Sequence, residues 1–180
     1  MKTILITILY ISLSVQGYGQ FTENFNDSNF TTAPAWSGNT ADWIVNPALQ
    51  LQTNNVAANA SFYLSTVSNL ATTAQWEFYV KLAFNPSSAN FIDVFLTASA
   101  SDLVQNSTTG YFVRIGSADD DICLYRKDPG GISVKIIDGV NGILNTSNNV
   151  MKIKVFRNAA NLWNLSRDLS GSGNNYFNEG

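Results

Sequence analysis

The chain contains no histidine among its 180 residues. Catalysis by Ser-His-Asp or Cys-His groups needs an imidazole as general base, so these classes of enzyme are excluded. Zinc sites also lose their commonest ligand. Any function of this protein must therefore rest on other side chains.

Charged residues are scarce: they make up 13% of the chain, with 10 Lys and Arg against 13 Asp and Glu. A basic patch that neutralises phosphates is not available, so nucleic acid is not an expected partner. The surface must instead be built largely from Asn, Ser, Thr and Gln. This composition suits an extracellular domain but identifies no ligand.

Cysteine is limited to Cys123, so an internal disulfide cannot form. Because Cys123 stands between Ile122 and Leu124 in an apolar segment, we interpret it as a buried, inert thiol, the alternative being a reactive one. The domain must then be stabilised by burial of its core.

Residues 1–19 have the features of a secretory signal peptide. Met1-Lys2 supplies a positive start, Thr3 to Val15 an apolar core, and Gly17-Tyr18-Gly19 a small-x-small cleavage site. The core is shorter than the ~20 apolar residues that span a bilayer, and no later segment qualifies. We therefore expect a secreted or cell-surface protein without a membrane span after cleavage, and one domain over residues 20–180.

The segment from Trp76 to Phe84 alternates bulky apolar residues with Glu77 and Lys81, as a half-buried β-strand does. Similar segments recur between turn-forming clusters, and no window has a helical apolar stripe. Strands are expected at 21–25, 43–45, 49–51, 62–64, 76–84, 91–96, 111–115, 122–126, 132–137, 151–157 and 162–166. This spacing predicts an all-β, antiparallel, two-sheet β-sandwich.

Several details of the topology follow from local patterns. Residues 91–96 are apolar on both faces apart from Asp93, which predicts a central strand. Asp138-Gly139 is typical of a two-residue hairpin turn, and 100–104 is the best candidate for a helical turn. Tyr176-Phe177 begins a strand whose partner is missing, so we expect a chain truncated at its C-terminus, with an open sheet edge.

Glycoside hydrolysis remains chemically possible, because it needs only two carboxyl groups about 5–9.5 Å apart. The carboxylate motif Glu-x-Asp-x-x-Glu of jelly-roll glucanases is missing. Asp93 could act with Glu77 only if their strands pair in a suitable register; otherwise Asp93 is a structural, hydrogen-bonded residue.

Two candidate sites remain for binding. Asp119, Asp120 and Asp121 form an acidic hairpin tip that could hold Ca²⁺, although the same tip could simply be solvated. A concave sheet face that carries Glu77, Tyr79, Arg114 and Tyr125 is the predicted ligand surface. Trp76 and Trp163 lie in phase with the apolar faces of their strands and are expected to pack the core.

Five segments, in their order along the chain, carry a resemblance to a known family. They are Phe21-Thr22-Glu23-Asn24-Phe25-Asn26-Asp27, Ala35-Trp36-Ser37-Gly38, Trp76-Glu77-Phe78-Tyr79-Val80, Phe84-Asn85-Pro86-Ser87-Ser88 and Gly110-Tyr111-Phe112-Val113-Arg114-Ile115-Gly116. Together they resemble the concanavalin A-like (LamG or glucanase type) jelly-roll region of secreted Bacteroidetes surface proteins, often found with lamin-tail domains. The resemblance implies a jelly roll and a non-catalytic module of a longer, multidomain protein.

Three functions are compatible with these observations. The first is a lectin-like carbohydrate-binding or adhesion module that contacts a glycan or another surface protein. The second is a structural spacer in a large surface protein, and the third is a glycoside hydrolase. Fold analogy alone does not decide between them.

Overall fold

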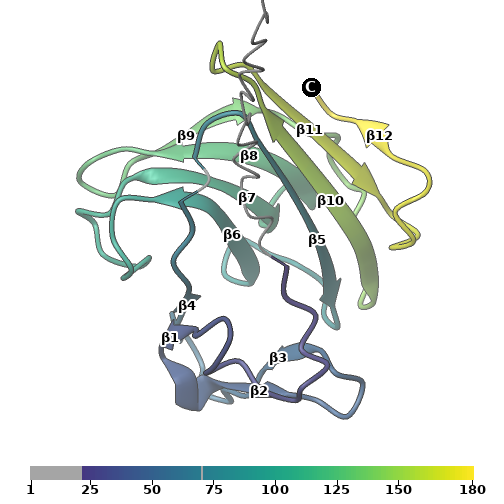
Figure 1. Ribbon diagram of the computed structural model, residues 1–180. Helices are drawn as coiled ribbons and strands as arrows, with labels where there is room; N and C mark the ends of the chain where they lie inside the picture. The colour runs from purple at the N-terminus through teal and green to yellow at the C-terminus, as the bar shows by residue number, and fades with distance from the viewer. Residues whose placement is uncertain (1–21, 70) are drawn as a thin grey trace, which may run out of the picture.

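The computed structural model describes residues 22–69 and 71–180 (Figure 1). The predicted signal peptide, residues 1–19, lies outside these residues. Within them, no helix has both the length and the apolar character needed to cross a membrane.

Two antiparallel four-stranded sheets form the body of the protein (Figure 1). The first has the order β12-β11-β10-β5, with β5 (Ala74–Leu82), β10 (Asn149–Arg157), β11 (Trp163–Asp168) and β12 (Phe177–Asn178). The second has the order β6-β7-β8-β9, with β6 (Phe91–Ala98), β7 (Gly110–Gly116), β8 (Asp121–Lys127) and β9 (Ser133–Ile137). The predicted all-β, two-sheet β-sandwich is confirmed.

The core lies between the two sheets, because each strand turns alternate residues inward. Val80 of β5 stands opposite Met151 of β10, and both belong to a buried cluster that also contains Ile122 and Leu124 of β8. Burying one such side chain contributes about 1.5–3 kcal/mol. Trp76 and Trp163 pack against this cluster, as predicted.

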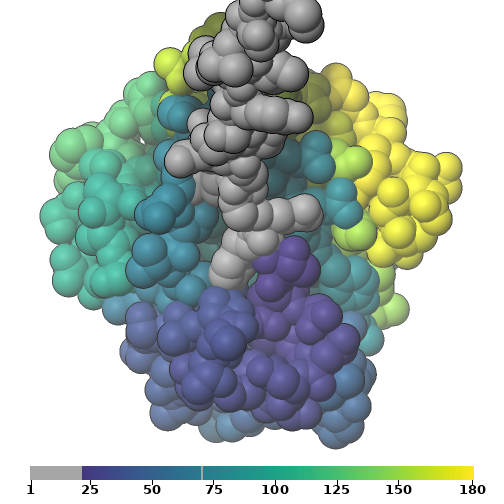
Figure 2. Space-filling view, in the orientation of Figure 1, coloured from purple at the N-terminus to yellow at the C-terminus, as the bar shows by residue number. Residues whose placement is uncertain are grey.

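Residues 22–69 lie at one end of the sandwich (Figures 1 and 2). They form two short strand pairs and one 3₁₀ turn: β1 (Ser37–Gly38) with β4 (Leu64–Ser65), β2 (Trp43–Val45) with β3 (Leu51–Thr53), and η1 (Thr40–Asp42). β2 and β3 form a hairpin after Val45. Asn46 closes it, because its side-chain oxygen accepts hydrogen bonds from the N–H groups of Ala48 and Gln50.

The opening strand predicted at 21–25 is wrong for the described part, since residues 22–25 are not in a strand. The side chain of Glu23 accepts a hydrogen bond from the N–H of Phe25, which has a left-handed φ of 56°. This local contact competes with strand pairing.

The central position predicted for 91–96 is also wrong, because β6 is an edge strand of its sheet. The strand is apolar on both faces because each face packs against a different part of the protein. Leu96 lies in the core, whereas Phe95 stacks on Phe112 of β7 on the outer face of the sheet, with 5.0 Å between ring centroids.

Asp138-Gly139 does not form the predicted hairpin turn. The chain leaves β9 here and crosses to β10 in the other sheet. Gly139 is required for a different reason, since a Cβ at this position would lie 2.2 Å from the carbonyl oxygen of Ile122. The glycine permits a close approach to β8.

Two smaller predictions are corrected. Residues 100–104 contain bends and no helical turn. The strand predicted at Tyr176-Phe177 does have a partner, because β12 pairs with β11, placing Phe177 opposite Arg167.

Candidate functional site

The structure divides the predicted ligand surface into two parts. Glu77 and Tyr79 lie on β5 of one sheet, whereas Arg114 and Tyr125 lie on β7 and β8 of the other. Both pairs face away from the core, on opposite sides of the sandwich, because they alternate with core residues of their own strands. The four side chains therefore do not form the single concave face that the sequence predicted.

Arg114 and Asp93 form a pair with two hydrogen bonds, Nε to Oδ1 at 2.8 Å and Nη2 to Oδ2 at 2.7 Å. The guanidinium also lies 4.2 Å from the ring centroid of Phe91 and 5.3 Å from that of Tyr125. Of the two interpretations of Asp93, the structure thus supports the structural, hydrogen-bonded one. Two N–H donors of Arg114 are thus engaged by Asp93, and its guanidinium packs against aromatic rings.

The aromatic rings around Arg114 stack on one another. Phe112 lies between Phe95 and Tyr125, at centroid distances of 5.0 Å and 5.3 Å, and is buried. Because ring faces are used for these contacts, this ladder stabilises the sheet and offers little open ring face to a ligand.

Glu77 is paired with lysines of the neighbouring strand, whereas Tyr79 is 43% exposed on the same outer face. Glu77 lies 2.7 Å from Nζ of Lys152 and 3.6 Å from Nζ of Lys154 on β10. The hydrogen bond from Lys152 is the main cause that lowers the pKa of Glu77. The loop 169–176 lies against this surface, since a Cβ at Gly171 would meet Tyr79 at 3.1 Å.

The predicted calcium residues do not act together. Asp119 is exposed and Asp120 half-buried, and their main-chain carbonyls accept the N–H groups of Gly142 and Leu144 in the crossover loop. In the described part of the chain, the one group of acidic and thiol side chains close enough to share a cation is Asp121, Cys123 and Asp138. The structure thus does not bring the side chains of the three consecutive aspartates together as one group.

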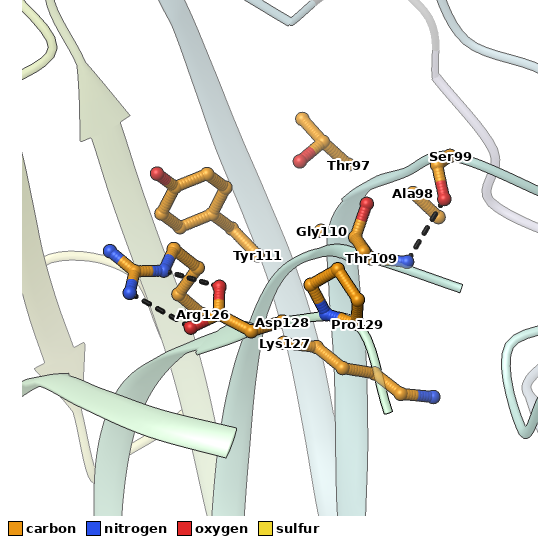
Figure 3. A pocket seen from close by; sticks show the side chains of 10 residues that line it. All are labelled: Thr97, Ala98, Ser99, Thr109, Gly110, Tyr111, Arg126, Lys127, Asp128 and Pro129. Atoms are coloured by element: carbon orange, nitrogen blue, oxygen red, sulfur yellow. Dashed lines mark hydrogen bonds and ion pairs between the residues drawn. The ribbon is translucent and has the colours of Figure 1, made fainter. Parts of the chain in front are cut away.

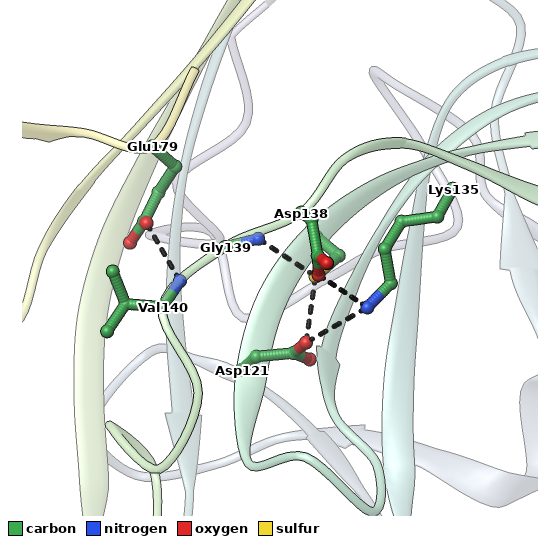
Figure 4. A network of polar contacts seen from close by, with 7 residues as sticks. Asp121, Lys135, Asp138, Gly139, Val140 and Glu179 are labelled. Atoms are coloured by element: carbon green, nitrogen blue, oxygen red, sulfur yellow. Dashed lines mark hydrogen bonds and ion pairs between the residues drawn. The ribbon is translucent and has the colours of Figure 1, made fainter.

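A lysine already occupies the centre of that group (Figure 4). Nζ of Lys135 lies 2.5 Å from Asp138 and 3.4 Å from Asp121. Its hydrogen bond to Asp138 raises the pKa of Lys135 and lowers the pKa of Asp138. The ammonium group contacts both carboxylates, so a cation of the protein itself already lies between them.

Cys123 is buried, and its thiol donates to Asp121 at 2.9 Å. Burial, together with this carboxylate, raises the pKa of Cys123 to about 12. We expect 5,5′-dithiobis-(2-nitrobenzoate) at pH 8 to label the folded protein at least about a hundredfold more slowly than the protein unfolded in guanidinium, because the thiolate is the reactive form. Equal rates would contradict the inert thiol.

The hydrolase pair does not exist in this fold. Glu77 lies on β5, which pairs with β10, and Asp93 lies on β6, which pairs with β7. The register on which that prediction depended is thus not formed.

An open groove of about 480 Å³ lies where β6 ends, β7 begins and β8 ends (Figure 3). Its lining residues are Thr97, Ala98, Ser99, Thr109, Gly110, Tyr111, Arg126, Lys127, Asp128 and Pro129. The groove combines the phenol ring of Tyr111, the hydroxyl groups of Thr97, Ser99 and Thr109, and a charged pair. Such a mixture can hydrogen-bond and stack on a polar ring-shaped ligand.

The charged pair in the groove is Arg126 and Asp128. Nε and Nη2 of Arg126 donate to the two carboxylate oxygens of Asp128 at 2.7 Å and 2.9 Å (Figure 3). This hydrogen bonding lowers the pKa of Asp128, so the carboxylate stays ionised and can accept hydrogen bonds on its free lone pairs. Both side chains remain partly exposed to a ligand.

Tyr111 is held rigidly at the side of the groove. Its ring lies 4.6 Å from that of Trp163, which in turn stacks on Trp76 at 5.7 Å. The guanidinium of Arg157 lies 5.5 Å from the ring of Tyr111. The neighbouring sheet thus supports the tyrosine, which lowers the entropy lost when a ligand stacks on it.

Lys127 fixes the loop between β6 and β7, which borders the groove. Its ammonium donates hydrogen bonds to the carbonyls of Leu103 and Gln105 at 2.9 Å and 2.8 Å. The predicted ligand surface did not include Tyr111, Arg126 or Asp128. A signal was present, since these two charges are two residues apart at the end of a strand and so lie on one face.

Comparison of the chain with protein-family models, curated proteins and solved structures finds no match.

Proposed function

We propose that this protein is a secreted, non-catalytic carbohydrate-binding or adhesion module of a bacterial cell-surface protein, with a jelly-roll sandwich of the concanavalin A-like type. The observation that carries the proposal is the groove in which the supported ring of Tyr111 lies beside the Arg126–Asp128 pair. The sequence resemblance to Bacteroidetes surface proteins supports the same proposal and its cell-surface location.

The groove chemistry fits an uncharged sugar. The C–H face of a pyranose packs on an aromatic ring, while its hydroxyls donate to a carboxylate and accept from a guanidinium. Arg126 and Asp128 neutralise each other, so they impose no requirement for a charged ligand. The hydroxyls of Thr97, Ser99 and Thr109 add further donors and acceptors along the wall.

Binding to a glycan array, followed by calorimetry on the best neutral oligosaccharide, tests the proposal. We expect Tyr111→Leu and Asp128→Asn each to weaken binding at least about tenfold, which corresponds to about 1.4 kcal/mol. The matched controls are Tyr79→Leu, on the outer face of the other sheet, and Asp119→Asn, at the exposed hairpin tip. Both controls should bind as the unchanged protein does.

Three results would overturn this assignment. A loss of binding in Tyr79→Leu but not in Tyr111→Leu would show that the glycan binds on the outer face of β5. Binding that disappears when EDTA replaces Ca²⁺ would revive a calcium-dependent site. The absence of any glycan binding would favour the structural spacer. Thermal unfolding of each variant shows whether a loss of binding reflects a loss of fold.

A further inference from the structure

Strand β9 forms an edge of its sheet. It pairs with β8 on one side, and among residues 22–69 and 71–180 no strand pairs with its other side. An edge strand presents unpaired N–H and C=O groups that can bind another strand.

The register with β8 shows which main-chain groups of β9 point outward. The N–H of Asp128 donates to the carbonyl of Ile132, so this pair is hydrogen-bonded. Hydrogen-bonded and non-hydrogen-bonded pairs alternate along an antiparallel ladder. Val134, opposite Arg126, therefore also bonds inward. It follows that Ser133 and Lys135 direct their N–H and C=O groups outward.

The side chains along this edge are apolar and exposed. Ile132 is 63% exposed, Val134 36% and Ile136 39%. They occupy every second position, so they can contact a strand laid against the edge. Exposed apolar side chains on a free edge mark an interaction surface.

The usual protection of an edge strand is weak here. The one charge on β9, Lys135, is drawn to Asp121 and Asp138, so its ammonium is not free to repel an incoming strand. A bulge between Lys135 and Ile137 interrupts the pairing with β8. It lies at the end of the strand and leaves Ser133 to Lys135 regular.

We propose that β9 pairs with β9 of a second copy of this chain, antiparallel and about a two-fold axis at Val134. In this register Ser133 of one copy stands opposite Lys135 of the other, and these are the residues whose main-chain groups point outward. The pairing forms four hydrogen bonds. It also places Val134 against Val134 and Ile132 against Ile136 of the second copy, so the edge is complementary to itself.

Sedimentation equilibrium tests the proposal, with Val134→Lys as the disrupting variant. Two lysines would then face each other at the axis, and we expect the dimer dissociation constant to rise at least about thirtyfold. The control is Val67→Lys, because Val67 is 85% exposed in the N-terminal part of the chain. It makes the same chemical change elsewhere and should leave association unaltered.

Hydrogen exchange locates the contact. Amide protection of Ser133 and Lys135 should increase with protein concentration in the unchanged protein and stay constant in Val134→Lys. A protein that stays monomeric up to about 1 mM, near the limit of weak association, would overturn the proposal. So would a dimer that Val134→Lys and Val67→Lys affect equally.

Discussion

Glu179→Gln is expected to destabilise the protein by about 3–5 kcal/mol, because it leaves the guanidinium of Arg167 buried without its counter-ion. The two side chains form an ion pair in which Arg167 is 11% exposed and Glu179 1% exposed. Glu179 also accepts the N–H of Val140 at 3.0 Å (Figure 4). This carboxylate thereby joins the residues after β12 to the crossover loop.

The matched control is Glu77→Gln. Glu77 is paired with Lys152 on a surface where both side chains are about one-third exposed. Exposed pairs are worth about 0–1 kcal/mol, since water screens them. Guanidinium unfolding measures both variants, and equal losses would contradict the assigned burial. Replacing both partners, as in Arg167→Met with Glu179→Leu, should recover much of the stability, because no unpaired charge then remains.

Asp168→Ala is expected to cost about 3 kcal/mol and to release the loop that follows β11. Asp168 is buried, and its carboxylate organises residues 170–175. It accepts hydrogen bonds from Ser170 N, Ser170 Oγ, Ser172 Oγ, Gly173 N, Asn174 N and Asn175 N, at distances of 2.7 to 3.2 Å. Removal of the carboxylate would leave several of these donors unpaired.

The loop held by Asp168 covers part of the outer surface of the first sheet. A Cβ at Gly171 would lie 2.7 Å from Val150, and one at Gly173 would lie 2.9 Å from Lys152. Release of the loop should therefore expose β10. Urea unfolding measures the stability, and hydrogen exchange of Gly173 to Asn175 measures the order of the loop. Asp119→Ala, at an exposed position, is the control and should change neither.

Acid should weaken the same contacts. The hydrogen bonds from Ser170, followed by those from Asn175 and Ser172, hold the pKa of Asp168 well below its usual range. An aspartate whose pKa is depressed by folding stabilises the folded protein. The stabilisation is complete when the pH lies above the pKa of the unfolded chain, about 3.9, and it is lost progressively as the pH falls below that value. The difference in stability between the unchanged protein and Asp168→Ala should therefore shrink below about pH 4.

Strand identity could be predicted from sequence because period-two patterns reflect which face is buried. The segment around Tyr111 to Ile115 and the segment around Met151 to Phe156 alternate, and both are strands within one or two residues of the predicted bounds. Alternation specifies faces, but it does not specify which sheet a strand joins.

The errors of prediction have the same origin. Glu77 and Arg114 both lie on outer faces, as their phase indicated, yet they belong to different sheets. Asp138-Gly139 has the local chemistry of a hairpin, but Gly139 serves a close approach to Ile122 that is 17 residues away in sequence. Contacts of this kind leave no periodic signal.

The sequence by itself determined the chemistry that is excluded, the all-β class and the inward or outward direction of most strand residues. These properties depend on residue type and on local alternation. The tertiary structure alone decided that Tyr111, Arg126 and Asp128 share a groove, that Lys135 pairs with Asp121 and Asp138, and that β9 is an edge. Each of these depends on strand order and on contacts between distant segments, which local sequence patterns do not encode.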